Sequence, residues 1–320
     1  MMMLLLLFFY PREQRFQGKT FSQSLRGFSH DGYQLGTEPP YSPVGVFSPS
    51  TERSQATDAL EHFGKPDVAA LVRLAGAKHS MLSPIWVWMS GKLPFLKLQY
   101  STASEKQSQA VAAFIHYGSR SAPAVPALLT LLQDERTARP ALYALAFVGS
   151  DAERQVPALT NFLIHAHPSY LQMDAMATLG ELGQKAREAQ PVLSLRLMST
   201  NDYVSAMAAV TLSRVGARSP RLAALITHRL ASATAQRGYT ASPAEMYLWA
   251  IGNLGSGAKD SITVIAQFTN SPAMQVRQRA GEAIEKIAKA VGQGIEPDAS
   301  PSGGPAVPSA NSGVAEGRHR

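Results

Sequence analysis

The stretch "GSDAERQVPALTNFL" (149–163) decides the fold, because the same arrangement occurs three times in the chain. A glycine, a proline eight positions later and an apolar run recur in "GSRSAPAVPALLTLL" (118–132) and "GQKAREAQPVLSLRL" (183–197). Glycine after a helix readily takes the left-handed conformation that closes the last turn, and proline suits the first turn of the next helix. Each stretch therefore predicts a helix that ends at the glycine and a second helix that begins near the proline.

Six apolar segments extend this pattern into a repeat across most of the chain. Each has apolar residues four positions and one position before its last residue, which places an apolar stripe on one face of a helix. A small residue stands five positions before each end and lets neighbouring helices approach closely. The last residues are 31, 34, 33, 39 and 33 positions apart, a period typical of stacked helix pairs. The segments are "AVAAFIHYG" (110–118), "ALYALAFVG" (141–149), "AMATLGELG" (175–183), "AAVTLSRVG" (208–216), "YLWAIGNLG" (247–255) and "AGEAIEKIA" (280–288).

The helix that follows each of the first four glycines is predicted to bury a pair of apolar residues against this stripe. Thr102 with Glu105 and Ser242 with Glu245 have the spacing of capping boxes, which mark helix starts. One helix pair cannot bury its apolar face alone, so the pairs must stack. The buried pairs are expected to be Leu128 and Leu132, Leu159 and Leu163, Leu193 and Leu197, and Ile226 and Leu230.

The helix start G-x₇-P-x-L and the helix end A-x-x-A-L-x-x-h-G, where h is apolar, resemble HEAT repeats, especially the short bacterial class named after phycobilisome lyases. The resemblance covers 103–290 and implies an all-α, right-handed α-α superhelix, a HEAT/armadillo-like solenoid of about six to seven helix pairs. The fourth and fifth units depart from the pattern, because Ala224 and Thr263 replace the proline. Upstream, "ATDALEHFG" has the same ending, so 51–102 are expected to form a divergent, irregular first unit.

The two ends of the chain differ from the repeats in composition. Residues 1–11 are hydrophobic and predict a signal or anchor remnant, although ten apolar residues are too few to span a bilayer. Residues 12–50 are expected to be extended. Their "FQGKTFSQSL" (16–25) resembles a segment of uncharacterised bacterial HEAT-repeat proteins, in which it follows an N-terminal hydrophobic segment. This favours an exported or membrane-anchored protein of the periplasm or cell envelope, with a cytoplasmic protein as the alternative. Residues 291–320, rich in Pro, Gly, Ser and Ala, predict a disordered tail.

The formal net charge is +7 and the pI is about 9.6, which raises the question of a polyanionic partner. Residues 201–290 carry 10 Lys and Arg against 5 Asp and Glu, and residues 1–100 carry 10 against 7. Because the excess is spread out and forms no block of like charges, a mildly basic surface is favoured over a polyanion site.

No catalytic, cofactor or metal motif occurs in the chain, so we expect a non-enzymatic protein. There is no cysteine, and the paired His-Glu dipeptides of HEAT-repeat di-iron hydroxylases are missing. "GKT" at 18–20 lacks the first glycine of a phosphate-binding loop, because Glu13 stands in its place.

Two alternatives come from other HEAT-like families. DNA glycosylases of this fold hold a duplex against a basic concave face and use an acidic residue with Trp and Arg, a role that Trp249, Arg214 and Asp202 in the 201–290 region could fill. Phycobilin lyases share the repeat class and would hold a tetrapyrrole in the groove. No motif beyond the repeat supports either alternative.

The remaining candidate site is the concave groove, which the second helix of each pair usually lines in this fold. Aromatic residues and arginine there are typical of surfaces that bind a partner protein. The sequence therefore predicts a non-catalytic scaffold that binds an unknown protein in its groove. The alternative is that several of these side chains fill core space between repeats. The predicted groove residues are Tyr143, Phe147, Tyr170, Tyr203, Arg214, Trp249 and Asn253.

Overall fold

The computed structural model describes residues 13, 15–28, 32–36, 41–46, 51–78, 101–149, 151–165, 167–233 and 241–293. The predicted hydrophobic segment 1–11, the second part of the first unit and residues 294–320 of the predicted tail lie outside these residues. The predicted start of the tail at residue 291 is wrong, because Val291 and Gly292 are the last residues of the helix Met274–Gly292. Within the described ranges, no helix is both long enough and apolar enough to cross a membrane.

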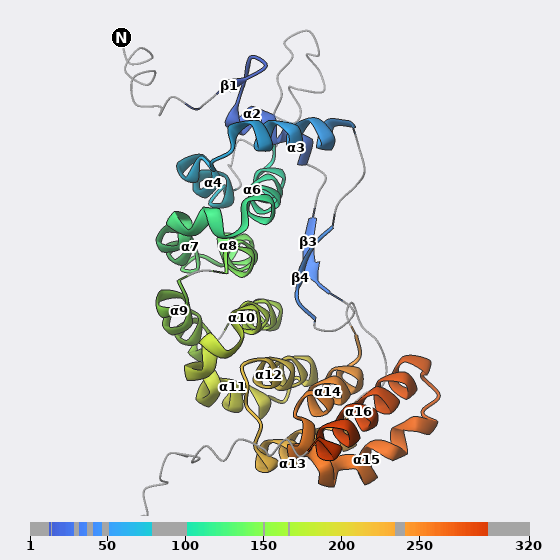
Figure 1. Cartoon of the computed structure of the whole chain (residues 1–320). Helices are drawn as coiled ribbons and strands as arrows, with labels where there is room; N and C mark the ends of the chain where they lie inside the picture. Colours follow the sequence, from blue (N-terminus) through green and yellow to red (C-terminus); the bar gives the residue numbers. More distant parts are fainter. Residues whose placement is uncertain are drawn as a thin grey trace, which may run out of the picture.

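The helices stack in two layers and form a curved solenoid (Figure 1). Each inner helix packs against the next inner helix, and each outer helix packs against the inner helix that follows it in the chain. Six such pairs occur in the described part of the chain, so the predicted all-α solenoid of HEAT/armadillo-like helix pairs is confirmed. The inner helices are α6 (Ala103–Tyr117), α8 (Glu135–Val148), α10 (Ser169–Leu182), α12 (Asp202–Arg214), α14 (Pro243–Asn253) and α16 (Met274–Gly292). The outer helices are α4 (Val68–Ala75), α7 (Val125–Leu131), α9 (Ala152–Ile164), α11 (Gln190–Leu197), α13 (Pro220–Ala231) and α15 (Ile262–Gln267).

The glycines that end the repeats have the positive φ angles that the sequence predicts. Gly149 closes α8 in the left-handed conformation, with φ 59° and ψ 3°. Gly118 and Gly183 also have positive φ, but their ψ angles of −130° and −135° lead into 3-10 helices rather than a left-handed turn. Those are η3 (Gly118–Ala124) and η4 (Gly183–Ala189), and η5 (Gly255–Ser261) follows the equivalent glycine in the fifth unit.

The prolines confirm the predicted helix starts in two units out of three. Pro126 and Pro191 lie in the first turns of α7 and α11, directly after the 3-10 helices. The prediction is wrong for Pro157, which lies inside α9. The reason is that Asp151, with φ 65°, redirects the chain at once, so that α9 begins at Ala152 without a 3-10 segment.

The predicted core is confirmed at almost every position. All eight apolar residues expected in the outer helices are buried, and so are those of the inner stripe except Ile284, which is half-buried. The small residues between inner helices are also buried, and two of them make hydrogen bonds across the layer. Thr178 Oγ1 donates to the Leu142 carbonyl oxygen at 3.1 Å, and Thr211 Oγ1 donates to that of Met176 at 3.1 Å.

Both predicted capping boxes are present. In each, the hydroxyl oxygen accepts from the backbone N–H three residues later, and the glutamate accepts from the capping residue's own N–H. The Ser242–Glu245 pair is buried, with Glu245 only 1% exposed. These caps fix where α6 and α14 begin.

The N-terminal residues form small elements that pack on the first helices. Within 12–50, for which the sequence predicts extended chain, β1 (Arg15–Phe16) pairs with β2 (Lys19–Thr20), and α2 (Phe21–Ser24) and η1 (Leu25–Phe28) follow. Phe21, Leu25 and Phe28 are buried, and η1 contacts both α6 and α3 (Thr51–Phe63). This part of the chain is therefore fixed to the solenoid core.

A second hairpin lies on the concave side of the solenoid (Figure 1). It consists of β3 (Gly32–Leu35) and β4 (Pro43–Val46), paired antiparallel with Leu35 opposite Pro43. The Gly36 N–H donates to the Ser42 carbonyl oxygen at 2.9 Å and extends the pairing by one bond. We call the described residues 32–36 and 41–46 the cover hairpin.

The repeat glycines allow a direct test of the backbone argument. Gly118→Ala should lower the free energy of unfolding by about 1–2 kcal/mol, because a side chain disfavours positive φ although the nearest atom to the added Cβ is 3.9 Å away. Gly281→Ala, inside α16 and with open space around it, should raise it by about 0.5–1 kcal/mol. Urea unfolding of both variants measures the difference. Equal effects of the two substitutions would contradict the assigned role of Gly118.

Candidate functional site

The concave face is covered in part by the chain itself. Strand β3 contacts α6, and β4 contacts α10. Side chains of the cover hairpin also reach α8, α12 and α14 through three contact points, each of which includes a residue predicted for the groove. The surface where the sequence places a partner thus already holds a polypeptide segment.

At the first contact point, Tyr33 of β3 packs on Tyr143 of α8. Their ring centroids are 4.7 Å apart, with planes tilted by 49°. The Arg139 guanidinium carbon lies 6.0 Å from the centroid of the Tyr33 ring, 5.8 Å from that of Tyr143 and 5.7 Å from that of Tyr170. One cation is thus placed among three aromatic rings, an arrangement that their quadrupoles favour.

Asp174 of α10 accepts hydrogen bonds from two members of this cluster. Arg139 Nε donates to its Oδ2 at 3.0 Å, and the Tyr143 hydroxyl donates to its Oδ1 at 3.2 Å. The carboxylate is 2% exposed, and this burial raises the pKa of Asp174 to about 6 despite the opposing effects of Arg139 and Tyr143. Burial also raises the pKa of Tyr33 to about 12, so its hydroxyl stays protonated.

At the second contact point, Arg214 at the end of α12 joins the hairpin to α10. Its Nη1 donates to Ser42 Oγ at 3.1 Å, and its Nη2 donates to Glu181 Oε1 at 2.8 Å. The guanidinium lies on Gly180, where an added Cβ would be 3.3 Å from Nη1. A glycine inside α10 thus provides the space that the arginine needs.

At the third contact point, Tyr41 packs edge-on against Trp249 of α14. The ring centroids are 5.9 Å apart, at an angle of 78° between the planes. Lys286 Nζ of α16 lies 5.8 Å from the Trp249 ring centroid and donates to Asn253 Oδ1 at 3.2 Å. Tyr41 is only 1% exposed and belongs to the hydrophobic core.

The structure brings five of the seven predicted groove residues to these contact points. Phe147 and Tyr203 are half-buried and take no part in these three contact points. Tyr203 packs against the core instead. The prediction did not include Arg139, Asp174 and Lys286, or the residues of the hairpin itself. Asp174 has a signal in the sequence, since it occupies an outward repeat position in α10. The residues at the contact points are Tyr143 and Tyr170, Arg214, and Trp249 and Asn253.

The basic residues of the nucleic-acid alternative are largely engaged within the fold. Arg214 pairs with Glu181, and Arg229 Nη2 donates to the Ser199 carbonyl oxygen at 2.8 Å, next to the end of α11. Arg196 of α11 donates in the same way to the carbonyl oxygens of Leu163 and Ile164 at the end of α9. Arg229 and Arg196 thus donate to carbonyl oxygens at or just after the C-terminus of the preceding outer helix, where a positive charge is favourable.

The glycosylase-like set does not converge. Asp202 is the first residue of α12 and Arg214 the last, and a helix of 13 residues is about 20 Å long. Trp249 packs on Tyr41 rather than beside Asp202. No group of three or more His, Cys, Asp and Glu suited to a metal ion occurs among the residues that the structure describes.

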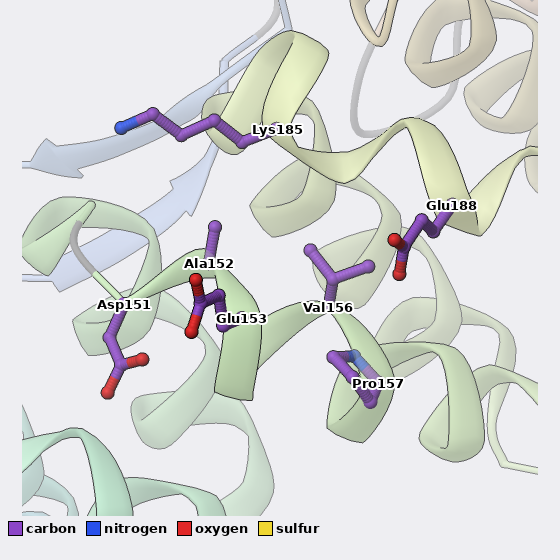
Figure 2. A pocket seen from close by; sticks show the side chains of 7 residues that line it. All are labelled: Asp151, Ala152, Glu153, Val156, Pro157, Lys185 and Glu188. Carbon is purple, nitrogen blue, oxygen red and sulfur yellow. The ribbon is translucent and has the colours of Figure 1, made fainter.

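Two pockets lie away from the concave face, between successive outer elements. The larger, of about 550 Å³, has α9 residues on one side and Lys185 and Glu188 of η4 on the other (Figure 2). A smaller one of about 230 Å³ lies between α13 and η5. Both lie between an outer helix and the 3-10 helix of the next repeat, and we assign no site to either.

Comparisons with known proteins identify no family for this chain. No protein-family model matches, and a search of curated proteins finds no match. One similar solved structure is the crystal structure of an engineered protein, with 21% sequence identity, 75% of this chain and 93% of that chain covered, and a TM-score of 0.33. Another is a designed armadillo repeat protein in complex with the peptide (KR)4, with 13% identity, 84% and 100% covered, and a TM-score of 0.41. Because both TM-scores are below 0.5, neither likeness assigns a function.

The buried carboxylate predicts a pH dependence of stability. A folded-state pKa of about 6, raised from 3.8, means that the contribution of Asp174 is fully present below pH 4 and is lost as the pH rises to 6. The difference in free energy of unfolding between the wild type and the Asp174→Asn variant should therefore shift against the wild type by up to about 3 kcal/mol as the pH rises from 4 to 7.

Urea unfolding of both proteins at pH 4, 5, 6 and 7 measures this difference. Asp260→Asn, which removes an exposed carboxylate from η5, is the matched control for the loss of one charge. A constant difference between wild type and Asp174→Asn over this range would show that Asp174 titrates normally.

Proposed function

We propose that the protein is a non-catalytic scaffold that binds another polypeptide along the concave face of its helix-pair solenoid. The observation that carries this proposal is the cover hairpin. Polypeptide already lies on this face, held by Tyr33 on Tyr143, Ser42 on Arg214 and Tyr41 on Trp249. A surface that holds one segment in this way has the chemistry to hold another.

The side chains at the contact points support a protein partner. Aromatic rings and arginine contribute most of the binding energy in many protein interfaces. Here they occur at intervals along successive inner helices, as a long segment requires. Tyr170, at the edge of the first contact point, is 49% exposed and leaves aromatic surface open beside the hairpin.

The cluster around Asp174 supports positioning rather than catalysis. Each carboxylate oxygen accepts a hydrogen bond, from Arg139 and from Tyr143, and the Tyr33 ring lies against the same tyrosine. A general acid or base needs access to a substrate, whereas this carboxylate is 2% exposed. It keeps Arg139 and Tyr143 in place for ring contacts.

Three finer predictions from the sequence remain predictions. They are export or membrane anchoring through residues 1–11, membership of the phycobilisome-lyase class of HEAT-like repeats, and the nucleic-acid and chromophore alternatives. None of them has support from the contacts described above, so the proposed function does not depend on them.

Site-specific photo-crosslinking tests the proposal. A photoreactive amino acid at Tyr170, in the full chain produced in its own cells, should give covalent adducts with a distinct protein partner. The same amino acid at Leu195, which is 71% exposed on the outer helix α11, is the matched control and should give none. Adducts with nucleic acid alone, or the same proteins from both positions, would contradict a protein-binding concave face.

A further inference from the structure

We propose that the cover hairpin is an intramolecular ligand of the concave face. It competes with a partner that presents an extended segment with two aromatic side chains, one for the first and one for the third contact point. This inference rests on the proposed function and adds to it the kind of partner and the means by which access is controlled.

The hairpin is tethered to the solenoid at both ends. Before it, Phe28 is 3% exposed, and after it, Ala56 and Leu60 of α3 are 1% and 0% exposed. The cover hairpin therefore lies in the sequence between two fixed anchors. A ligand on such a tether has an effective concentration in about the millimolar range, so that it occupies its site even when each contact is weak.

Except at Tyr41, the contacts of the hairpin resemble those of a ligand more than those of a core element. Among the residues that the structure describes, its two strands pair only with each other, and a single two-stranded hairpin is marginally stable by itself. Strand β3 contacts α6 and β4 contacts α10, and the side-chain contacts with the inner helices include one ring pair at each end and one hydrogen bond from Arg214. Tyr41, however, is 1% exposed and belongs to the same hydrophobic core as Phe21 and Leu25. Detachment of the hairpin therefore has to expose Tyr41, so that the hairpin is detached in only a small fraction of molecules, while Phe21 and Leu25 stay buried.

The spacing of the contact points defines what a partner must present. Tyr143 and Trp249 belong to α8 and α14, which are three inner-helix spacings apart. At 8–10 Å for each spacing, this corresponds to about 24–30 Å, or about seven to nine residues of extended chain. The chain itself reaches these two points with Tyr33 and Tyr41, which lie on opposite sides of an antiparallel pair, so the estimate of seven to nine residues applies to a partner in a single extended strand. A partner segment needs two aromatic residues at a similar separation, with a hydrogen-bond acceptor between or beside them for Arg214.

Competition with a tethered segment makes a quantitative prediction. The apparent affinity of any partner is reduced by the small fraction of molecules in which the hairpin is detached. Weakening the hairpin must therefore strengthen binding of a ligand added in solution, although no residue of the concave face has changed. If the hairpin were instead a required part of the binding surface, weakening the hairpin would weaken binding of that ligand.

The test uses the full chain and a fluorescent synthetic peptide with the sequence of residues 29–49. Tyr33→Ala combined with Tyr41→Ala should bind this peptide at least tenfold more tightly than the wild type does, as measured by fluorescence anisotropy. Adding Trp249→Ala to the double variant should remove that gain. Gln34→Ala, an exposed residue of the same strand, is the matched control and should behave as the wild type.

A second variant protects the test from a folding defect. Because Tyr41 is nearly completely buried, Tyr33→Ala alone, which removes a half-buried ring, is measured in parallel and should strengthen binding by a smaller factor. Urea unfolding confirms that each variant is folded. Equal affinity of the wild type and the Tyr33→Ala variant for the peptide, or no binding to either, would overturn the inference.

The outcomes separate this inference from the proposed function. If the peptide test fails while Tyr170 still crosslinks to a protein partner, the hairpin is a fixed part of the binding surface and only the inference is wrong. If the peptide binds as expected but Tyr170 crosslinks to no protein even in the double variant, the proposed function is wrong and the claim of competition with a partner falls with it.

Discussion

Close packing between successive inner helices is the constraint on which the rest of the structure depends. The residues between these helices are Ala, Thr and Gly. A Cβ added at Gly252 of α14 would lie only 3.0 Å from the Ala283 Cα of α16, and the Thr178 hydroxyl reaches the backbone of α8. The outer helices carry larger buried side chains, such as Leu159 and Leu193. A stack with smaller residues on one side bends toward that side, so the residues between the inner helices produce the concave face.

The same constraint determines which side chains are left for the concave face. Large residues such as Tyr143 and Trp249 instead lie on the concave side of the inner helices, where their rings need another segment to cover them. The cover hairpin provides it, and in doing so it contributes to the burial of the Asp174 carboxylate among Tyr143, Arg139 and Tyr33. Removing a carboxylate from water is costly even when it is paired, and the raised pKa of Asp174 reflects that cost. The face therefore combines favourable ring contacts with one strained ionisable group, which limits how firmly the hairpin is held.

Local patterns explain what could be predicted from the sequence. The inner stripe, the outer leucines, the repeat glycines and the capping boxes follow from spacing within one repeat. The structure confirms them except at Ile284, at Pro157 and in the ψ angles of Gly118 and Gly183. Five of the seven proposed groove residues lie at the contact points because outward positions on inner helices follow from the same period. The cover hairpin could not be placed, since Ser42 and Arg214 are 172 positions apart and the hairpin sequence carries no repeat. Its contacts depend on the assembled curve of the solenoid, which no local window contains.

The hairpin also changes the physical character of the solenoid. In a repeat protein each unit contacts only its neighbours, so that distant units are coupled weakly. Here one short segment contacts α8, α12 and α14 directly, and its anchors belong to the first helices. A ligand that displaces it would therefore remove a connection between distant repeats as well as uncover a surface. Binding at the concave face and the curvature of the solenoid are then linked through the same three contacts. A ligand that displaces the hairpin also breaks the contacts that join α8, α12 and α14, so it favours conformations in which these helices are less constrained.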